Sequence, residues 1–575
     1  MDFQIEVNNS LILVNEGETL LTALRRNGIK IPTLCHMNRF SPTGACRLCV
    51  VEVDGKRDLI TSCSFPVEKG MKVFTNSPRV IRARKSIVEM LLSNHPDDCL
   101  YCERNGNCEL QWLAEEMNVK ERKFFANKNA QYPDNSSTSV FRDPAKCVLC
   151  SRCVRICEET QYVTAIDFTS RANNIKVNSA FNKGLNISSC INCGQCIMVC
   201  PTGALTDISH IEKVQANIDK KKKEVIFFVS PSVTASIIEH YGIKTEQNPA
   251  WLISAALKKM GASKVFDLGV ASDLNIREEA RLLIDRVKNG NKGPLYSSCC
   301  PAWVKFVEEF QPELIPSLST AKSPQQIFGA LLKTWYAKEE KVMPDNIFSV
   351  AVMPCVGKKF EASREEMTFK GISEVDAVLT IREFVRMVRS NGIDLRRIEP
   401  VPFDKPFSAS SKNALKLGYL GGKAEAIAFE LFENLKTSSR ETFKFNVPKN
   451  LSGRKEFKLN IGKKTIGFAW VSGITNAKAY IDDLIADGRS DIHYIEVMTC
   501  LDGCVGGGGQ PINRIPDKTK NRKKACQDLE KFSPWDNPGN NICLDSIFRT
   551  MEKSPDKETW PKLFHTRFIE RNVPK

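Results

Sequence analysis

The chain has 575 residues and a formal net charge of +15, from 82 Lys and Arg against 67 Asp and Glu. With 42% hydrophobic and 26% charged residues, its composition is that of a globular protein with several domains. Its longest unbroken aliphatic and aromatic run, 225–229, is too short to cross a bilayer, so we expect no membrane span. The positive charge alone allows a nucleic acid, an anionic surface or an acidic protein as partner.

Cysteine is the unusual component of the chain: there are 22, mostly in Cys-x-x-Cys steps. The first five residues show no basic stretch followed by an apolar one, so we expect no export signal. Thiols of a protein that is not exported stay reduced, and clustered cysteines then indicate metal sites rather than disulfides.

The first expected domain, residues 1–78, begins with a hairpin and a helix. Residues 3–14 alternate around Asn-Asn-Ser at 8–10, and a helical pattern over 19–27 ends at Gly28. Four cysteines follow: Cys35, Cys46, Cys49 and Cys63. Their spacing departs from that of plant-type [2Fe-2S] proteins and by itself leaves zinc as an alternative. Their position behind a hairpin and helix, ahead of further cluster sites, favours a [2Fe-2S] cluster.

A second expected domain, residues 79–130, is mostly helical, with apolar residues at 87, 88, 91 and 92 on one buried face. Its candidate ligands are His95, Cys99, Cys102 and Cys108. A lone histidine is more often a surface or core residue, but one that opens a tight cysteine series favours a metal ligand. We therefore expect a [4Fe-4S] cluster with one imidazole ligand.

The third expected domain, residues 131–212, contains an internal repeat of cysteines spaced x2, x2 and x3. The two runs are Cys147, Cys150, Cys153, Cys157 and Cys190, Cys193, Cys196, Cys200, the second followed by Pro201. In bacterial two-cluster ferredoxins the fourth cysteine of each such run binds the other cluster. We therefore expect one [4Fe-4S] site at Cys147, Cys150, Cys153 and Cys200, and another at Cys157, Cys190, Cys193 and Cys196. Two four-cysteine zinc sites are the alternative, which the doubled x2 spacing disfavours.

Beyond a solvated Lys220–Lys223 junction, short apolar runs alternate with helical stretches, which predicts a large α/β domain over 213–512 and a tail over 513–575. The expected strands are Val225–Val229, Lys264–Leu268, Phe348–Met353, Val375–Thr380, Lys464–Val471 and His493–Met498. Two of them are followed closely by Cys355 and Cys500. Ligands of open α/β sheets gather beyond the carboxyl ends of strands, so these thiols mark a candidate site.

Three segments of this domain resemble the active-site signatures of the [FeFe], or iron-only, hydrogenases. They read SSCCPAW (297–303), MPCVGKKFE (353–361) and EVMTCLDGCVGGGGQP (496–511). The upstream modules resemble the accessory chain of larger family members, and the similarity covers roughly residues 1–512. It implies that Cys300, Cys355, Cys500 and Cys504 hold a [4Fe-4S] cube, with Cys504 bridging to a diiron subsite that carries CO, CN and a dithiolate amine. This combined cofactor is the H-cluster.

The resemblance also implies roles around the cofactor. Cys299 would relay protons to Glu279, then to Ser319, with Arg286 further out, while Lys358 offers a positive charge to an anionic ligand. The cofactor pocket would be lined by Ser230, Pro231, Ser232, Pro324, Met353, Lys358, Leu417 and Met498. The glycine run 506–509 suits close approach to a bulky cofactor and is not a phosphate fingerprint.

This sequence departs from the family pattern at several positions. Leu282 stands where the family usually has a second relay glutamate, so Asp285, Arg281 or water would have to serve the outer proton route. Ser230 adds a hydroxyl, and Leu417 makes one wall of the pocket smaller. In the tail, Cys526 and Cys543 have no family counterpart; they are plain thiols or serve an intersubunit role.

We therefore expect a multidomain α/β and α+β protein: a β-grasp [2Fe-2S] domain, a helical His/Cys cluster domain, a two-cluster ferredoxin-like domain and a large catalytic domain. The implied function is reversible H2 oxidation and proton reduction, with electrons relayed through a [2Fe-2S] and three accessory [4Fe-4S] clusters to ferredoxin or another redox protein. A hydrogen-sensing relative with low turnover, or the hydrogenase subunit of a flavin- and NAD-containing complex, are the alternatives. Maturation proteins are further expected partners, and nucleic acid is not. The expected location is the cytoplasm, with a hydrogenosome or similar organelle as the alternative.

Overall fold

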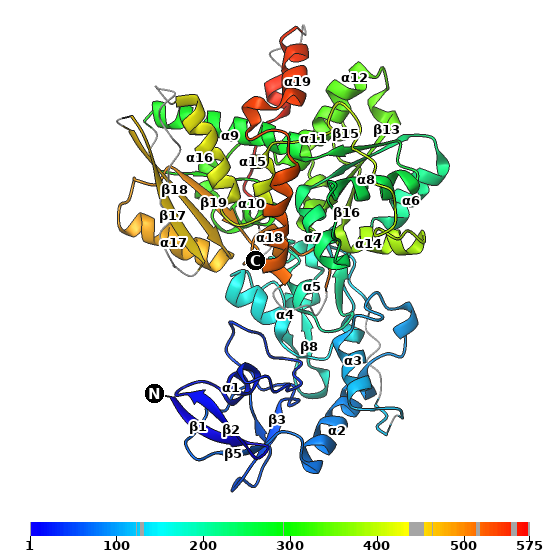
Figure 1. The fold of residues 1–575 in the computed structure, drawn as a ribbon, viewed down its shortest axis with the longest axis vertical. Helices are drawn as coiled ribbons and strands as arrows, with labels where there is room; N and C mark the ends of the chain where they lie inside the picture. Colours follow the sequence, from blue (N-terminus) through cyan, green and yellow to red (C-terminus); the bar gives the residue numbers. More distant parts are fainter. Residues whose placement is uncertain are drawn as a thin grey trace.

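The computed structural model describes residues 2–121, 123–126, 132–290, 293–435, 453–462, 464–512, 518–553 and 560–572. The domain borders expected at 130–131 and 512–513 touch residues outside these ranges. Figure 1 shows three small modules, coloured blue to cyan, below a large domain that carries the rest of the chain. None of the helices in the described part is both long and apolar enough to span a membrane.

The first module is a five-stranded sheet of order β2-β1-β5-β3-β4 with one helix on it. Its elements are β1 (Asp2–Val7), β2 (Ser10–Asn15), α1 (Leu20–Arg26), β3 (Val50–Val53), β4 (Ile60–Thr61) and β5 (Lys72–Phe74). The predicted hairpin is confirmed: β1 and β2 pair antiparallel across Asn8 and Asn9, which both have positive φ, as a tight two-residue turn requires. The predicted helix is confirmed as α1, which Thr19 caps.

The second module consists of α2 (Pro78–Asn94), a short turn η1 (Cys99–Tyr101) and α3 (Glu109–Glu116). Val88 is fully buried, and Ile87, Leu91 and Leu92 are half-buried against the same cluster. That cluster includes Leu34 and Leu48 of the first module. The predicted apolar face of α2 is therefore confirmed, and it packs against the loop that carries the first cysteine set.

The third module holds the cysteine repeat between short antiparallel strand pairs. Its elements are β6 (Val140–Arg142) with β9 (Leu205–Asp207), β7 (Asp167–Thr169) with β8 (Lys176–Asn178), α4 (Arg152–Arg155) and α5 (Gln195–Val199). α4 and α5 occupy corresponding positions of the two repeats, behind their second cysteines.

The large domain contains two four-stranded sheets that lie side by side (Figure 1). The first, all parallel, has the order β11 (Lys264–Asp267), β10 (Glu224–Val229), β13 (Ile347–Met353), β16 (Ala377–Thr380). The second has the order β12 (Leu295–Tyr296), β19 (Tyr494–Met498), β18 (Lys464–Ser472), β17 (Arg454–Ile461), antiparallel only at β17. All six predicted strands are found, together with β12 and β17, which we had not predicted.

Helices cover both faces of each sheet. The first sheet packs on one face against α6 (Ile211–Lys220), α7 (Pro231–Tyr241), α8 (Ala250–Lys259) and α14 (Ile381–Ser390), and on the other against α11 (Pro324–Leu331). The second sheet packs against α10 (Pro301–Phe310) and α17 (Ile474–Ala486) on one face and α16 (Gly422–Leu435) on the other. The 20-residue α9 (Gly269–Lys288) joins the two sheets, because its first half packs in the core of one and its second half in the core of the other.

The third module is fixed to the large domain by a buried arginine. Arg382 pairs with Asp207 of β9 at 3.2 Å and donates hydrogen bonds to the carbonyl oxygens of Gly508 and Gln510. Both ionic partners are buried, so the interface excludes water around the pair. These contacts join the end of the ferredoxin-like module to the glycine run of the large domain.

The described part of the tail packs on the large domain. α18 (Lys518–Leu529) lies along α7, and its buried Arg522 pairs with Glu239 and donates to the carbonyl oxygens of Val505 and Pro511. α19 (Ile542–Lys553) adds apolar residues to the core of the first sheet. Cys526 and Cys543 are both buried within this chain, which disfavours an intersubunit role for either thiol.

Candidate active site

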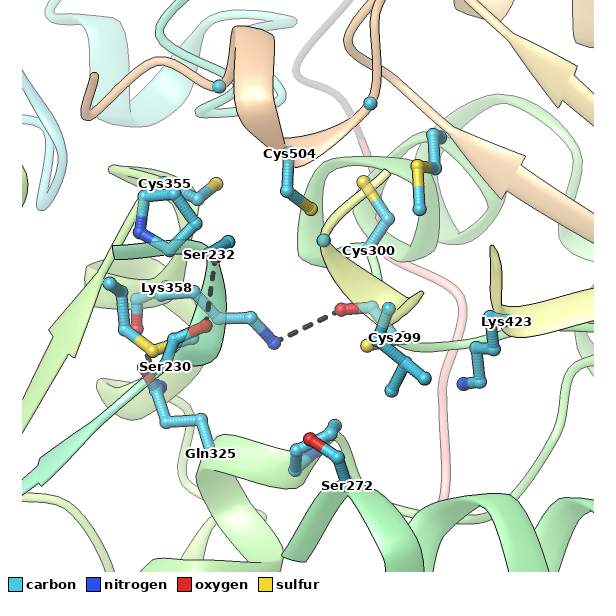
Figure 2. A pocket seen from close by; sticks show the side chains of 18 of the residues that line it. Ser230, Ser232, Ser272, Cys299, Cys300, Gln325, Cys355, Lys358, Lys423 and Cys504 are labelled. Atoms are coloured by element: carbon cyan, nitrogen blue, oxygen red, sulfur yellow. Dashed lines mark hydrogen bonds between the residues drawn. The ribbon is translucent and has the colours of Figure 1, made fainter. Parts of the chain in front are cut away.

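One cavity of about 920 Å³ lies between the two sheets of the large domain. The carboxyl ends of β10, β13 and β19 open onto it, and so do the segment after β12 and the start of α16 (Figure 2). This is the position that parallel α/β sheets use for ligands, because the strands end there and the following loops diverge. The site predicted from the cysteines that follow β13 and β19 therefore coincides with a real cavity.

Four thiols from three distant segments line this cavity: Cys300, Cys355, Cys500 and Cys504. Cys300 precedes α10, Cys355 lies between β13 and α13 (Gly357–Ala362), and Cys500 and Cys504 follow β19. Burial raises the pKa of Cys355 to about 12 and raises the pKa of Cys500 and Cys504 well above its usual value. Thiols whose pKa is raised in this way fit a centre that supplies the positive charge to keep them as thiolates, which is what a metal cluster does.

The glycine run 506–509 also allows close contacts between backbones, and Gly507 lines the cavity. A Cβ at Gly508 would lie 2.5 Å from the carbonyl oxygen of Cys193, and one at Gly507 2.5 Å from that of Pro354. These residues therefore allow close approach of two protein backbones, one from the ferredoxin-like module and one next to Cys355. The predicted close approach of this run to a cofactor stays a prediction.

Lys358 is buried beside the cavity, and its charge already has a partner. Its Nζ donates to the carbonyl oxygen of Cys299 at 3.0 Å (Figure 2). It also donates to both carboxylate oxygens of Glu361, at 2.8 and 3.0 Å. Burial opposes the charge, but Glu361 and the Cys299 thiol more than offset it and raise the pKa of Lys358. The ammonium therefore persists, yet part of its field is neutralised by Glu361, which the sequence motif did not indicate.

All the residues predicted to line the cofactor pocket do line this cavity: Ser230, Pro231, Ser232, Pro324, Met353, Lys358, Leu417 and Met498. The added hydroxyl of Ser230 forms a hydrogen bond of 2.9 Å with the Ser232 hydroxyl (Figure 2). Leu417 also packs into the core around α16, so the smaller side chain is held in place.

The predicted relay residues are only partly brought together. Cys299 lines the cavity, and Glu279, on α9, is fully buried. The carboxylate of Glu279 accepts hydrogen bonds from Lys423 Nζ at 2.7 Å and from the Tyr494 hydroxyl at 2.6 Å. Within the described residues, no hydrogen bond joins Glu279 to Cys299 or to Ser319.

The outer relay residues have local partners. Ser319 is buried, and its Oγ accepts from the backbone N–H of Ala321. Arg286 donates to Ser317 Oγ at 3.1 Å and to the Gly293 carbonyl oxygen. Of the substitutes considered for the missing glutamate, Arg281 pairs with Glu278 at 2.8 Å and lies 4.0 Å from Asp285, while Leu282 packs against the core around α16.

Three polar residues of this site were missed by sequence reasoning: Lys423, Tyr494 and Glu496. Burial raises the pKa of Glu496 to about 8, and Glu496 lines the cavity, with one carboxyl oxygen that has no hydrogen-bond partner among the described residues. Two signals could have found them. Tyr494 and Glu496 are two positions apart and therefore lie on one face of a predicted strand, and Lys423 is the only cation of a helix whose other charged residues are glutamates.

The cysteine repeat of the third module surrounds two further cavities, of about 460 and 450 Å³. One is lined by Cys147, Cys150, Cys153 and Cys200, and the other by Cys157, Cys190, Cys193 and Cys196. Each cavity thus receives the fourth cysteine of the opposite run, the exchange that the spacing predicts. The second cavity is next to the large domain, since Gln195 Nε2 donates to Cys500 Sγ at 3.1 Å.

The first cysteine set forms two close pairs. A hydrogen bond from Cys46 lowers the pKa of Cys35 to about 5, and one from Cys63 lowers the pKa of Cys49 to about 7. Within the described residues, no three His, Cys, Asp or Glu side chains are grouped as ligands of a single metal ion. Pairs of thiols fit a [2Fe-2S] cluster, in which each iron takes two protein ligands.

The second module's candidate ligands lie near the third module. Gly203 approaches Cys102 so closely that a Cβ would lie 2.6 Å from its Sγ, and the N–H of Glu109 donates to the Pro201 carbonyl oxygen. His95 is buried, Cys102 and Cys108 are partly buried, and Cys99 is exposed.

Comparison with known families agrees with this division. Residues 223–508 match the iron only hydrogenase large subunit, C-terminal domain. Residues 2–78 match a 2Fe-2S iron-sulfur cluster binding domain, 84–123 the NADH-ubiquinone oxidoreductase-G iron-sulfur binding region, and 146–204 a 4Fe-4S dicluster domain. Together these modules define a multidomain iron–sulfur oxidoreductase, and they confirm the predicted fold class.

Individual relatives make the class specific. The chain is 35% identical to the NADP-reducing hydrogenase subunit HndD of Solidesulfovibrio fructosivorans, over 99% of both chains. It is also 35% identical to iron hydrogenase 1 of Clostridium pasteurianum, over 88% of both chains. A structure of a variant of apo [FeFe]-hydrogenase HydA1 from Chlamydomonas reinhardtii superimposes with a TM-score of 0.56 at 25% identity, covering 63% of this chain and 99% of that one. The chain belongs to the [FeFe] hydrogenase family, which confirms the predicted resemblance.

Proposed function

We propose that the chain is an [FeFe] hydrogenase that interconverts H2 with protons and electrons and exchanges those electrons with a separate redox protein. The observation that carries the proposal is the convergence of Cys300, Cys355, Cys500 and Cys504, with Cys299 beside them, on one cavity of a family member. These four thiols would hold the [4Fe-4S] cube, and Cys504 would also hold the diiron subsite. When bound, this cofactor would supply the metal chemistry that splits H2.

The protein's own residues bind, orient and exclude water. Met353, Met498, Pro231 and Pro324 give the cavity wall its apolar part, which limits water around the cofactor. The Lys358 ammonium lies beside the cavity, where it is bonded to the Cys299 carbonyl oxygen and to Glu361. From this position it stabilises anionic ligands. Cys299 is the group that holds the proton released in the cavity.

Electrons follow the cysteine sets outward. Cys157, Cys190, Cys193 and Cys196 would hold the cluster nearest to the active site, because Gln195 links their segment directly to Cys500. The site at Cys147, Cys150, Cys153 and Cys200 follows. From there two branches are available: the [4Fe-4S] site with His95, which lies beside Gly203, and the [2Fe-2S] site of the first module.

The redox partner has two candidates. A soluble acidic ferredoxin suits the net charge of +15, and its reaction rate should fall steeply with ionic strength while that of a small neutral dye does not. A complex with a nucleotide-binding subunit is favoured by the full-length match to a subunit of an NADP-reducing hydrogenase. Anaerobic purification at native expression level separates the two: a stoichiometric flavin- or nucleotide-binding subunit identifies the complex, and a free chain identifies the ferredoxin type. For either partner we propose the cytoplasm as the location.

The loss of the relay glutamate at Leu282 motivates a slow, hydrogen-sensing function as a second candidate. Turnover of a Leu282→Glu variant decides this point, measured per loaded site. A rise of tenfold or more would favour the sensor, and turnover within a few fold of the parent would favour the enzyme.

The proposed activity itself is tested by anaerobic infrared spectroscopy of the matured protein. Bands from metal-bound CO and CN, lost on Cys504→Ser, are the expected result. A fully matured preparation that lacks them, or that contains zinc in place of iron, would reject the function.

A further inference from the structure

Lys423 and Glu279 form an ion pair inside the large domain that no relay role assigned above includes. Lys423 Nζ lies 2.7 Å from Glu279 Oε1, and the two side chains are 2% and 0% exposed. Lys423 also lines the cavity, on the same side as Cys299 (Figure 2). The pair therefore connects the cavity wall to the predicted relay carboxylate on α9.

The pair joins α9 and α16, whose shared core is apolar, and two hydroxyl groups hold the pair in one geometry. Ala280 and Ile276 of α9, and Ala424 and Ile427 of α16, belong to that core. Lys423 Nζ also donates to Ser297 Oγ at 3.0 Å, and the Tyr494 hydroxyl donates to the second oxygen of Glu279. In such a setting an ammonium and a carboxylate persist only as a matched pair, because either charge alone would be strongly desolvated.

Resting on the proposed function, we propose that Lys423 is a further residue of the proton path: it fixes Glu279 and hands it the proton that arrives from the cavity. In this step the N–H bond of the Lys423 ammonium breaks and an O–H bond forms at Glu279 Oε1. The amine then takes up the next proton from the cavity side, and the neutral carboxyl releases its own outward. Only a proton moves, so no oxidant or reductant is required.

The hydrogen bonds of the Glu279 carboxylate support this order of proton transfer, from Lys423 to Glu279. One carboxylate oxygen is occupied by Lys423 and the other by Tyr494, so a proton that comes from the cavity meets the ammonium before it meets the carboxylate. Glu496 also faces the pair, but burial raises its pKa and keeps its carboxyl neutral. The positive charge of Lys423 is therefore paired with Glu279 alone.

The test compares Lys423→Met, Lys423→Arg, Glu279→Gln and the double variant Lys423→Met/Glu279→Gln in matured protein. Infrared bands of CO and CN give the fraction of loaded sites, and turnover is expressed per loaded site. Lys423→Met is expected to lose roughly 100-fold in turnover, the size of a general acid–base contribution, with the CO and CN bands unchanged. The double variant should be no slower than the slower single variant, because both changes interrupt one step.

A second readout does not depend on turnover. The Lys423 ammonium should keep Glu279 ionised in the parent protein, whereas in Lys423→Met the buried carboxylate has lost its cation and should take up a proton. An additional protonated-carboxyl band, beside that of Glu496, should therefore appear in Lys423→Met and be absent from the double variant. Lys423→Arg should keep Glu279 ionised yet stay slow, since a guanidinium holds a carboxylate but does not release its proton.

Lys333→Met is the matched control. Lys333 is equally buried and pairs with Asp376 at 2.8 Å, but it lies at the opposite end of β13 from the cavity. Parent turnover in Lys423→Met, full recovery in Lys423→Arg, or an equal loss in Lys333→Met would each overturn the assignment. A parent protein without CO and CN bands would instead reject the proposed function, before any variant is compared.

Discussion

The amide of Gln195 donates a hydrogen bond to the thiol sulfur of Cys500 at 3.1 Å, across the border between the ferredoxin-like module and the large domain. The same Nε2 also donates to the carbonyl oxygen of Gly506. One side chain thus connects the segment of the second cysteine run to the thiol set of the candidate active site.

A donor to a cluster sulfur stabilises the reduced, more negative state of the cluster. We therefore predict that Gln195→Leu shifts the reduction potential of the cube at Cys500 to a more negative value. A redox titration followed by electron paramagnetic resonance measures it. Gln161→Leu is the control, because buried Gln161 donates to the backbone oxygen of Thr499 at 3.1 Å instead of to a sulfur. Equal shifts in the two variants would contradict the prediction.

The glycine run provides a steric test of the module interface. Gly508→Ala places a Cβ 2.5 Å from the Cys193 carbonyl oxygen, and neither backbone can move away easily. We expect a loss of about 1–3 kcal/mol in stability, the usual cost of overpacking, and incomplete iron loading of both neighbouring sites. Gly506→Ala, whose Cβ would come no closer than 3.3 Å to Asp502, should keep its iron. Iron and sulfide analysis per chain compares the two, and normal loading of Gly508→Ala would refute the steric argument.

The carboxyl of Glu496 should respond to pH in the physiological range. Because burial raises its pKa to about 8, it is protonated at pH 7 and ionises as the pH rises through that value. Between about pH 4.3 and 8 the folded state keeps a proton that the unfolded chain has already lost. The contribution of Glu496 to stability therefore declines as the pH rises across this range. Glu496→Gln should remove this decline and abolish a carboxyl band in infrared difference spectra between pH 6 and 9.5. A parent protein without that band would show that Glu496 is ionised throughout.

The Arg382–Asp207 pair predicts an acid-sensitive interface. Burial alone would raise the pKa of Asp207, but Arg382 and Lys359 hold it below its usual range. Its contribution to stability is therefore complete above about pH 4 and disappears as the pH falls through the lower pKa of the folded state. Asp207→Asn leaves the buried guanidinium without its counter-charge, which should cost about 3–5 kcal/mol.

Thermal unfolding monitored by cluster absorbance compares Asp207→Asn with the parent protein at neutral pH. The exposed pair of Lys478 and Asp482 gives the control, since Asp482→Asn removes a surface ion pair worth about 0–1 kcal/mol. Similar unfolding temperatures for the two variants would contradict a structural role of the buried pair.

Cysteine spacing and strand patterns allowed much of this molecule to be predicted. A cluster ligand set is encoded by short intervals along the chain, so the exchange of Cys157 and Cys200 between the two cavities could be predicted before any coordinates. Buried parallel strands leave continuous apolar runs, and all six were found. β12 was missed because it has two residues, and β17 because it is an edge strand with polar residues at alternate positions.

The relay could not be predicted in the same way. Its inner partner for Glu279 is Lys423, which is 144 positions away and belongs to no cysteine motif. The pairing depends on how α9 and α16 cross over the second sheet, and such a tertiary contact has no characteristic spacing in the sequence. The backbone contacts of Gly507 and Gly508 could not be predicted for the same reason, since their close neighbours come from the backbone near Pro354 and from another module.

Arg382 also bears on how quickly electrons can travel. Its guanidinium is bonded both to Asp207 of the ferredoxin-like module and to two carbonyl oxygens of the large domain. The two domains therefore cannot separate unless a buried charge loses its partners. The distance between successive redox sites at this junction is consequently fixed by the fold. Transfer there would be governed by distance and potential, with no hinge to wait for.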